Sequence, residues 1–124
     1  MDAIKFLDTY ILCEVLKGNK KYLPYLNGNF AVNDLILAEF YWTILREFNE
    51  ATANYWFAKL KNYSLPCSVD LMLEATRFRF KHKHKNLSFF DAAGYIFAQQ
   101  NNMVFVNGDK AFKDINKVEF VPVH

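Results

Sequence analysis

The chain has 124 residues, 52% of them hydrophobic and 18% aromatic, and its 15 Lys and Arg against 13 Asp and Glu give a formal charge of +2. A chain of this length can form a core that needs no disulfide or metal for stability. We therefore expect one domain over residues 1–124. The composition excludes a disordered, collagen-like or disulfide-rich chain.

The amino-terminal residues and the cysteines indicate a cytoplasmic protein. The opening MDAIKFLD is typical of neither a signal peptide nor a transit peptide. No stretch of the sequence approaches the ~18 apolar residues of a membrane span, so we expect no membrane association. Cys13 and Cys67 fit no CxxC pattern. We expect two small buried side chains in a reducing compartment, and a poor metal site.

Apolar runs bounded by turn residues predict strands, and segments with helical spacing of apolar residues lie between them. Pro66 places the third strand near a sheet edge. Asp8 or Thr9, Asn33 or Asp34, and Ser88 are candidate helix caps. The predicted strands cover 4–7, 30–32, 65–69, 103–106 and 118–123. The predicted helices cover 10–17, 20–26, 35–48, 51–62, 70–83 and 89–101, with a short helix in 108–113.

The order of these elements predicts the fold class. Strands that are separated by helices imply right-handed crossovers and a mostly parallel sheet with helices on both faces. We therefore expect a three-layer α/β/α sandwich. Ligands of such sheets bind beyond the carboxyl ends of the strands, so acidic residues at that edge are the first candidates for a site.

Four acidic residues are candidates. Asp8 ends the first strand and Asp109 follows the strand at 103–106, so both lie at that edge. Asp91 lies in the first turn of a helix that the topology alone does not place. Glu39 lies among apolar residues, where a charged carboxylate is costly unless it is paired or bound to a metal. Four converging carboxylates would favour Mg²⁺ or Mn²⁺ acting on a phosphate.

Each of these acids also has a purely structural interpretation. Asp8 can cap the helix that follows it, and Asp109 can be a turn residue. Asp91 lies three residues after Ser88, which is the spacing of a capping box. Glu39 can face a polar gap between helices or pair with a basic residue. The residues alone leave these alternatives open.

The segment from Arg77 to Lys85 concentrates five of the 15 basic residues and has no acid. Such a segment attracts a polyanion such as a nucleic acid. Alternatively, it is a solvated helix end whose cations complement the helix dipole. Arg77, Lys81 and Lys85 have the spacing of one helical face. His82 and His84 lack a Cys or an acid nearby and are expected at the surface. The candidate RNA-binding residues are Arg77, Arg79, Lys81, Lys83 and Lys85.

Four short motifs resemble, in order and spacing, those of the PIN-domain nucleases and, within them, the VapC-type ribonuclease toxins. The motifs span nearly the whole chain. They are FLDTYIL at 6–12, VNDLILAEF at 32–40, LSFFDAAGYIFA at 87–98 and VNGDKAF at 106–112. Tyr10 departs from the Asn or Ser usual in the family, and Asn107 from the usual Thr or Ser.

The resemblance implies a metal-dependent endoribonuclease. Its acidic cluster would consist of Asp8, Glu39, Asp91 and Asp109, which would bind Mg²⁺ or Mn²⁺ and hydrolyse RNA phosphodiester bonds. Thr9 and Asn107 would be accessory residues of this site. Because like charges repel, we expect at least one of the carboxylates to have a raised pKa and a divalent metal to stabilise the fold.

The resemblance also implies a homodimer and an antitoxin protein that lies in a groove near the active site. Two aromatic triplets, FYW at 40–42 and YWF at 55–57, supply candidate contacts. Helical neighbours point about 100° apart, so some of these rings should be exposed, unless other helices of the chain cover them. The candidate interface residues are Tyr41, Trp42, Tyr55, Trp56 and Phe57.

Three other functions are open at this stage. The chain can be a PIN-fold nuclease of RNA processing outside toxin–antitoxin systems, or a non-catalytic RNA-binding module of the same fold. A receiver domain has a similar length, but the region from Glu47 to Tyr55 lacks the phospho-acceptor Asp that it needs. No GxGxxG, P-loop, GxSxG or HExxH motif occurs.

Overall fold

The fold is built on five short parallel strands, as seen in a computed structural model that describes residues 3–122. The strand order is β3-β2-β1-β4-β5, and every pairing is parallel. The strands are β1 (Lys5–Leu7), β2 (Phe30–Asn33), β3 (Ser64–Leu65), β4 (Val104–Asn107) and β5 (Val118–Phe120). The predicted fold class is confirmed, and the sheet is wholly parallel.

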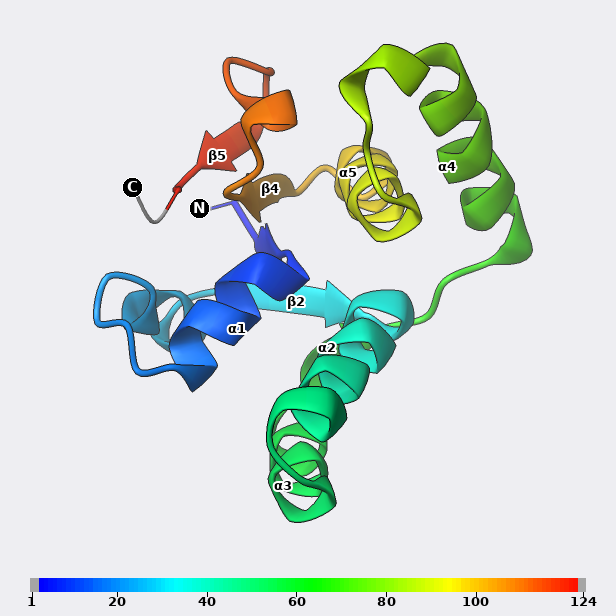
Figure 1. Cartoon of the computed structure of the whole chain (residues 1–124). Helices are drawn as coiled ribbons and strands as arrows, with labels where there is room; N and C mark the ends of the chain where they lie inside the picture. Colours follow the sequence, from blue (N-terminus) through cyan, green and yellow to red (C-terminus); the bar gives the residue numbers. More distant parts are fainter. Residues whose placement is uncertain (1–2, 123–124) are drawn as a thin grey trace.

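Helices follow the predicted order with small shifts at their ends. The α-helices are α1 (Thr9–Leu16), α2 (Asp34–Glu47), α3 (Glu50–Leu60), α4 (Val69–Lys81) and α5 (Phe89–Gln100). Short 3₁₀ helices are η1 (Leu23–Asn27), η2 (Lys61–Tyr63), η3 (Lys83–Lys85) and η4 (Lys110–Phe112). Figure 1 shows α4 and α5 packed together, and α2 and α3 as a pair that extends away from the strands.

Four predicted elements have different bounds in the structure. The third strand covers only 64–65, at the edge of the sheet, because Pro66 has no N–H for the ladder and Ser68 already caps α4. The helix predicted at 20–26 is the 3₁₀ helix at 23–27, with Pro24 in its first turn. Helix α4 ends at Lys81 rather than 83. The last strand ends at Phe120, and Val123 lies outside the described residues.

Register and alternation place the core on both faces of the sheet. Phe6 of β1 pairs in register with Phe105 of β4, and both rings pack toward α5, where the Phe6 and Phe97 centroids are 5.0 Å apart. Gly94 allows this approach, since an added Cβ would lie 3.0 Å from Phe105. Neighbouring strand residues point to opposite faces, so Leu7 points away from α5, toward the face that α1 covers.

This arrangement brings the ends of β2, β1 and β4 to one edge. Asn33 is the last residue of β2, Asp8 follows β1, and Asn107 is the last residue of β4. The backbone N–H of Asp8 donates to Val106 O at 3.2 Å, which joins the first residue after β1 to β4. All three polar side chains are buried.

Candidate active site

Asp8 is fixed at the point where β1 turns into α1. It is the N-cap of α1, and its Oδ2 accepts a hydrogen bond from Tyr10 N at 3.2 Å. Its other oxygen, Oδ1, is buried without a hydrogen-bond partner in the described chain. Burial raises the pKa of Asp8 well above its usual value, and the charges of Asp91 and Glu39 raise it further. The capping interpretation and the site interpretation therefore apply to the same side chain, with one oxygen for each.

The side chain of Glu39 extends from α2 into the depression that Asp8 also lines. The hydroxyl of Thr9 donates a short hydrogen bond to Glu39 Oε1. Burial raises the pKa of Glu39, the Thr9 bond lowers it, and the charge of Asp91 raises it. No ion pair of Glu39 is found in residues 3–122, so a basic partner is not what keeps this carboxylate in its apolar surroundings.

Asp91 lies in the first turn of α5, and its N–H donates to Ser88 Oγ at 3.0 Å, so the predicted cap is confirmed. Burial raises the pKa of Asp91, Ser88 lowers it, and the charge of Asp109 raises it. Asn107 lies close enough to lower the pKa of this carboxyl. The expectation of at least one raised carboxylate pKa is confirmed at Asp8, Glu39 and Asp91.

Asp109 joins the cluster from the turn after β4. The side-chain oxygen of Asn107 accepts a short hydrogen bond from Asp109 N, and Asp109 Oδ1 accepts one from Ala111 N at 2.9 Å. The Asn107 amide nitrogen is buried and has no hydrogen-bond partner of normal geometry within residues 3–122. Asn33 has the same arrangement: its oxygen caps α2 through Ile36 N, and its nitrogen has no partner there. The sequence indicated Asn33 only as a cap.

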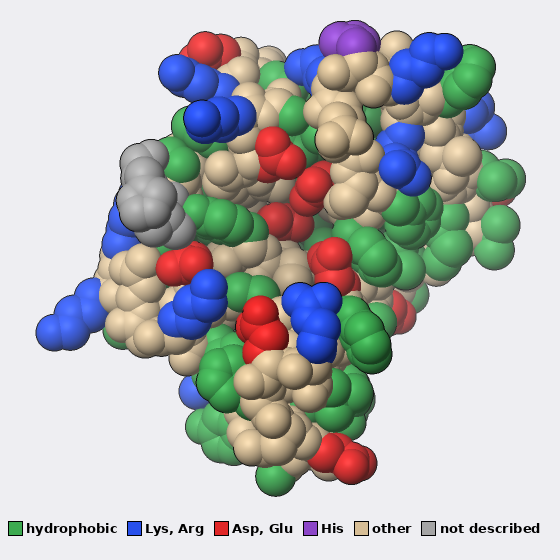
Figure 2. Space-filling model, viewed as in Figure 1, with side chains coloured by type: hydrophobic (Ala, Val, Ile, Leu, Met, Phe, Trp, Pro, Cys, Tyr) green, Lys and Arg blue, Asp and Glu red, His purple; other side chains and the backbone are tan. Residues whose placement is uncertain are grey.

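Asp8, Glu39 and Asp91 line one depression of about 410 Å³, and Asp109 lies beside Asp91. Figure 2 shows a group of acidic side chains in a hollow at the centre of this face, with Lys and Arg side chains around it. In the part of the chain that the structure describes, no three His, Cys, Asp or Glu side chains form a ready metal-binding group. The four acidic side chains are neighbours, but their carboxylates would have to move closer together to bind one ion.

The chemistry of the donors nevertheless fits a hard divalent cation. Carboxylate oxygens are the ligands that Mg²⁺ and Mn²⁺ prefer. Asp8 Oδ1 is a buried acceptor without a donor in the described residues, which is the kind of atom that a cation would satisfy. Cys13 also lines the depression, but burial raises the pKa of its thiol to about 12, so it stays protonated. Cys13 and Cys67 are half-buried, not fully buried as expected.

Tyr10, the first departure from the resemblance, lies against the turn after β4. An added Cβ on Gly108 would lie 2.4 Å from the Tyr10 ring. Tyr10 also lines the acidic depression, and its ring meets that of Tyr22 edge-on with centroids 6.2 Å apart. Gly108 is therefore required by the tyrosine at position 10, which packs against the turn that carries Asn107 and Asp109.

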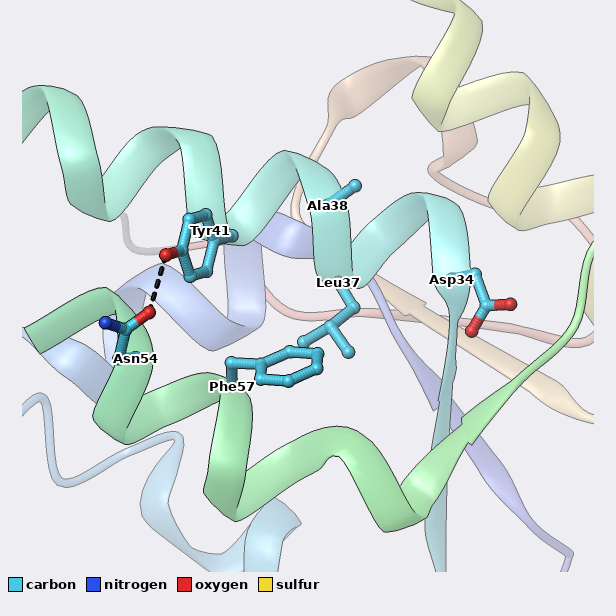
Figure 3. A pocket seen from close by; sticks show the side chains of 6 residues that line it. All are labelled: Asp34, Leu37, Ala38, Tyr41, Asn54 and Phe57. Atoms are coloured by element: carbon cyan, nitrogen blue, oxygen red, sulfur yellow. Dashed lines mark hydrogen bonds between the residues drawn. The ribbon is translucent and has the colours of Figure 1, made fainter. Parts of the chain in front are cut away.

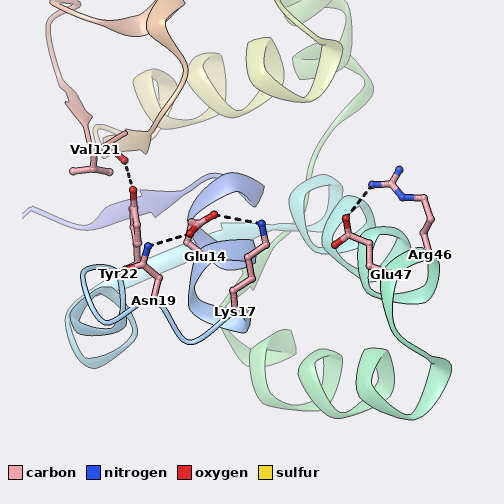
Figure 4. Close-up of polar contacts among 7 residues, drawn as sticks. All are labelled: Glu14, Lys17, Asn19, Tyr22, Arg46, Glu47 and Val121. Carbon is pink, nitrogen blue, oxygen red and sulfur yellow. Dashed lines mark hydrogen bonds and ion pairs between the residues drawn. The ribbon is translucent and has the colours of Figure 1, made fainter. Parts of the chain in front are cut away.

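Two basic residues at the rim of the depression were missed by the sequence analysis. Lys17, just after α1, pairs with Glu14 at 3.6 Å, and Arg46, in the last turn of α2, lies 3.9 Å from Glu47 (Figure 4). All four residues line the same depression as Asp8. Both pairs are partly or largely exposed, so they contribute little to stability. Neither cation belongs to a motif, and only their position in the fold shows them.

The basic segment from Arg77 to Lys85 does not form one helical face, which corrects the predicted sharing of a face by Arg77, Lys81 and Lys85. The α-helix stops at Lys81 and the chain turns through η3, so Lys85 leaves the helical register. Arg79 Nε donates to Leu87 O at 2.9 Å, and Lys85 Nζ donates to Ala111 O at 3.3 Å. Arg77 pairs with Glu74 at 3.1 Å. His82 is half-buried, unlike the expected surface position, and its ring is tilted against that of Phe78 with centroids 4.4 Å apart. His84 is exposed as expected.

The aromatic triplets divide between core and surface. Phe40 is buried, Tyr41 and Trp56 are partly buried, and Trp42, Tyr55 and Phe57 are exposed, so the expectation that some rings are exposed is confirmed. A groove of about 520 Å³ lies between α2 and α3. Figure 3 shows its lining side chains, among which Tyr41 OH donates to Asn54 Oδ1 at 2.6 Å. The groove is lined by Asp34, Leu37, Ala38, Tyr41, Asn54 and Phe57.

No helix within residues 3–122 is long and apolar enough to cross a membrane.

The chain has the PIN-like α/β fold of VapC toxin structures. It is similar to a toxin–antitoxin complex from Klebsiella pneumoniae, with 18% identity over 93% of this chain and 95% of that chain and a TM-score of 0.74. It is also similar to VapBC2 from Rickettsia felis bound to a promoter DNA fragment, with 18% identity over 98% of this chain and 99% of that one and a TM-score of 0.72.

A third similar structure is VapC20 from Mycobacterium tuberculosis, a toxin that cleaves the sarcin–ricin loop. The two are 16% identical over 83% of this chain and 85% of that one, with a TM-score of 0.70. No protein-family profile matches the sequence. No curated protein sequence matches it significantly.

Proposed function

We propose that this protein is a divalent-metal-dependent endoribonuclease and the toxin of a toxin–antitoxin pair, acting in the cytoplasm as a single domain. The observation that carries the proposal is the depression in which Asp8, Glu39 and Asp91 meet, each from a different element and each with a pKa raised by burial. Holding three mutually repelling carboxylates together costs stability, which a purely structural role would not explain.

Asp8, Glu39, Asp91 and Asp109 would together hold Mg²⁺ or Mn²⁺. When bound, the ion would supply a water of lowered pKa and neutralise charge on the phosphate. Asp8 offers the buried oxygen Oδ1 for this purpose while Oδ2 stays engaged with the start of α1.

The remaining steps belong to side chains of this chain. Thr9 fixes Glu39 through Oε1, which leaves Oε2 to accept a proton from the attacking water. Burial raises the pKa of Glu39, which favours uptake of a proton by this carboxylate. The buried amide of Asn107 lies beside Asp91 and lowers the pKa of that carboxyl, so it would help to keep Asp91 charged.

The test is RNA cleavage in Mn²⁺ by the wild-type chain and by two isosteric variants. We expect Asp8→Asn and Asp91→Asn to lose at least about 100-fold in cleavage rate, since each removes one charge at the reacting phosphate. Asp114→Asn is the matched control, because Asp114 lies in an exposed turn at a positive φ of 65° that Asn also adopts. Full activity of Asp8→Asn, or no cleavage by the wild type, would overturn the proposal.

Metal binding can be measured separately from RNA cleavage. Millimolar Mn²⁺ should raise the melting temperature of the wild type, because an ion that binds only the folded chain adds stability. Asp8→Asn should lose this increase. A melt that Mn²⁺ leaves unchanged would contradict the metal site even if RNA cleavage were seen.

The toxin assignment rests on the similarity to toxin–antitoxin structures. Expression in a host cell should arrest growth, and Asp91→Asn should relieve the arrest. A nuclease of RNA processing would cleave RNA without arresting growth. We further propose an antitoxin partner and a homodimer, whose contacts would use Tyr41, Tyr55, Trp56 or Phe57. Trp42, the fifth predicted interface residue, lines a different groove.

A further inference from the structure

A second groove opens beside the acidic depression, and we call it the aromatic groove. It has a volume of about 380 Å³ and is lined by Ala38, Glu39, Trp42, Thr43, Arg46 and Phe90. Glu39, Thr43 and Arg46 line both the aromatic groove and the acidic depression. The two hollows therefore adjoin along α2, so a strand whose phosphate lies at the acids has the aromatic groove directly beside it.

The aromatic groove is bordered by two flat rings that belong to different elements. Trp42 lies on α2 and is 59% exposed, although indole is among the largest apolar side chains. Phe90 lies in the first turn of α5, next to Asp91, and is half-buried. The rings thus flank the groove immediately beside two of the carboxylates, Glu39 and Asp91.

A cation lies in the same groove. Arg46 is largely exposed, and its guanidinium is 3.9 Å from the carboxylate of its neighbour Glu47. An exposed pair of this length is weak and leaves the cation available to a stronger anion. A ligand that suits the groove has a flat apolar face and a negative charge next to it.

We propose that the aromatic groove binds the nucleotide next to the scissile phosphate of a single-stranded RNA, with its base stacked on Trp42 and Phe90 and its phosphate on Arg46. The inference rests on the proposed nuclease function and specifies how its substrate is held. Stacking on aromatic side chains and cationic contacts to the backbone are the usual means of holding single strands. Adjacency to the acidic depression favours RNA here over a protein segment, because a nucleic acid already has to lie across Glu39 and Asp91.

The first experiment measures binding without cleavage, in the full chain carrying Asp8→Asn. Trp56→Phe in the same chain leaves Trp42 as the single indole, since the sequence has two Trp. Titration with a short single-stranded RNA should quench the Trp42 fluorescence. A series of RNAs of the same sequence, each with a single abasic site at a different position, should then be compared. Only one position of the abasic site should weaken binding.

Substitutions separate the roles of the groove residues. Trp42→Ala should weaken RNA binding by roughly 5-fold to 150-fold, the range expected for loss of one stacked base, and Trp42→Phe should retain most of the affinity. Arg46→Gln should lower the slope of log affinity against log salt by about 0.7, for one lost phosphate contact. Tyr63→Leu is the control, because Tyr63 is 47% exposed and lies in η2 outside the groove. It should bind RNA like the parent chain.

The outcomes distinguish this inference from the proposed function. If the parent chain binds RNA but Trp42→Ala binds equally well and the indole emission does not change, the inference is overturned and the nuclease function stands. If Trp42→Ala alters only the oligomeric state or capture of an antitoxin, the groove is a protein interface and the inference is again overturned. If the wild type neither binds nor cleaves RNA, both fail together.

Discussion

The hydroxyl of Thr9 donates a hydrogen bond to Oε1 of Glu39, so that the first residue of α1 fixes a carboxylate in the middle of α2. Burial raises the pKa of Glu39, and this bond is the main influence that lowers it. The two residues lie 30 positions apart, and their contact links the element that carries Asp8 to the one that carries Glu39. Thr9 therefore favours the charged form of Glu39 as well as fixing its position.

Removing the Thr9 hydroxyl should move the pH profile of cleavage. Thr9→Val deletes the donor and so raises the pKa of Glu39, and the acidic limb of kcat/KM against pH should shift to higher pH. Thr9→Ser keeps the donor and should keep the wild-type profile. An unshifted acidic limb in Thr9→Val would mean that Glu39 is not the group titrating in that limb.

Stability should depend on pH through Asp8. The folded pKa of Asp8 is raised above its unfolded value, so between these two values the folded chain binds more protons than the unfolded chain. The free energy of unfolding therefore falls as pH rises through this window. Asp8→Asn keeps an acceptor for Tyr10 N and removes the charge. In metal-free buffer it should melt several degrees above the wild type at neutral pH, since 1 kcal/mol is about 3–5 °C at this size.

The same comparison at low pH is the control. Below the ordinary carboxyl range Asp8 is neutral in both states, so the two melting temperatures should converge there. A constant difference across the pH range would assign the effect of Asp8→Asn to packing.

Gly108 and Tyr10 should be energetically coupled. Gly108→Ala places a Cβ in the space of the Tyr10 ring and should cost about 1–3 kcal/mol, as other overpacking substitutions do. In a chain that already carries Tyr10→Ala, the same substitution should cost much less. Chemical denaturation of the four chains of this double-mutant cycle measures the coupling, and additive effects would show that the ring and the turn are independent.

The basic segment should contribute to RNA affinity through its exposed residues. Lys81 ends α4 and Lys83 begins η3, and both are exposed. Changing each to Gln should reduce the salt slope of RNA binding by about 0.7. Lys59→Gln on α3 is the comparison and should leave the slope unchanged. Equal slopes in all three chains would leave the segment as a solvated helix end.

The groove between α2 and α3 should contribute to dimer formation. Phe57 is 45% exposed and lines this groove, so Phe57→Glu should shift the light-scattering mass toward the monomer by adding a charge to an apolar contact. Leu73 on α4 is 50% exposed and provides the matched variant Leu73→Glu, which should leave the mass unchanged. A wild-type chain that is monomeric at high concentration would remove the basis for this prediction.

Local signals in the sequence were sufficient for the fold. Asp8, Asn33 and Ser88 cap helices as predicted, because each has a short side-chain oxygen just before a helical apolar pattern. Alternation of strands with helices fixed the parallel sheet, and the β1 and β4 ends then brought Asp8 and Asp109 to one edge. Asp91 could not be placed this way, since the start of α5 depends on how α4 and α5 pack.

Tertiary geometry supplied the rest of the site. Lys17 and Arg46 lie at helix ends on different elements, and nothing in the sequence relates them to each other or to the acids. The aromatic groove depends on how α2 and the start of α5 approach one another, which spacing along one helix does not encode. The break at His82 was missed because continuous basic residues are compatible with both a helix and its end.

One face of α2 sets a fixed spacing between the acidic depression and the aromatic groove. Glu39, Trp42, Thr43 and Arg46 follow one another at helical spacing, and Phe40 and Ile44 on the other side of the helix are buried in the core. From Glu39 to Arg46 the helix rises by about 10 Å, a length set by backbone hydrogen bonds and not by flexible loops. The offset between the base that is held and the bond that is cut would then be fixed by helix pitch. One residue inserted after Glu39 would rotate the rest of the face by about 100° and uncouple recognition from cleavage.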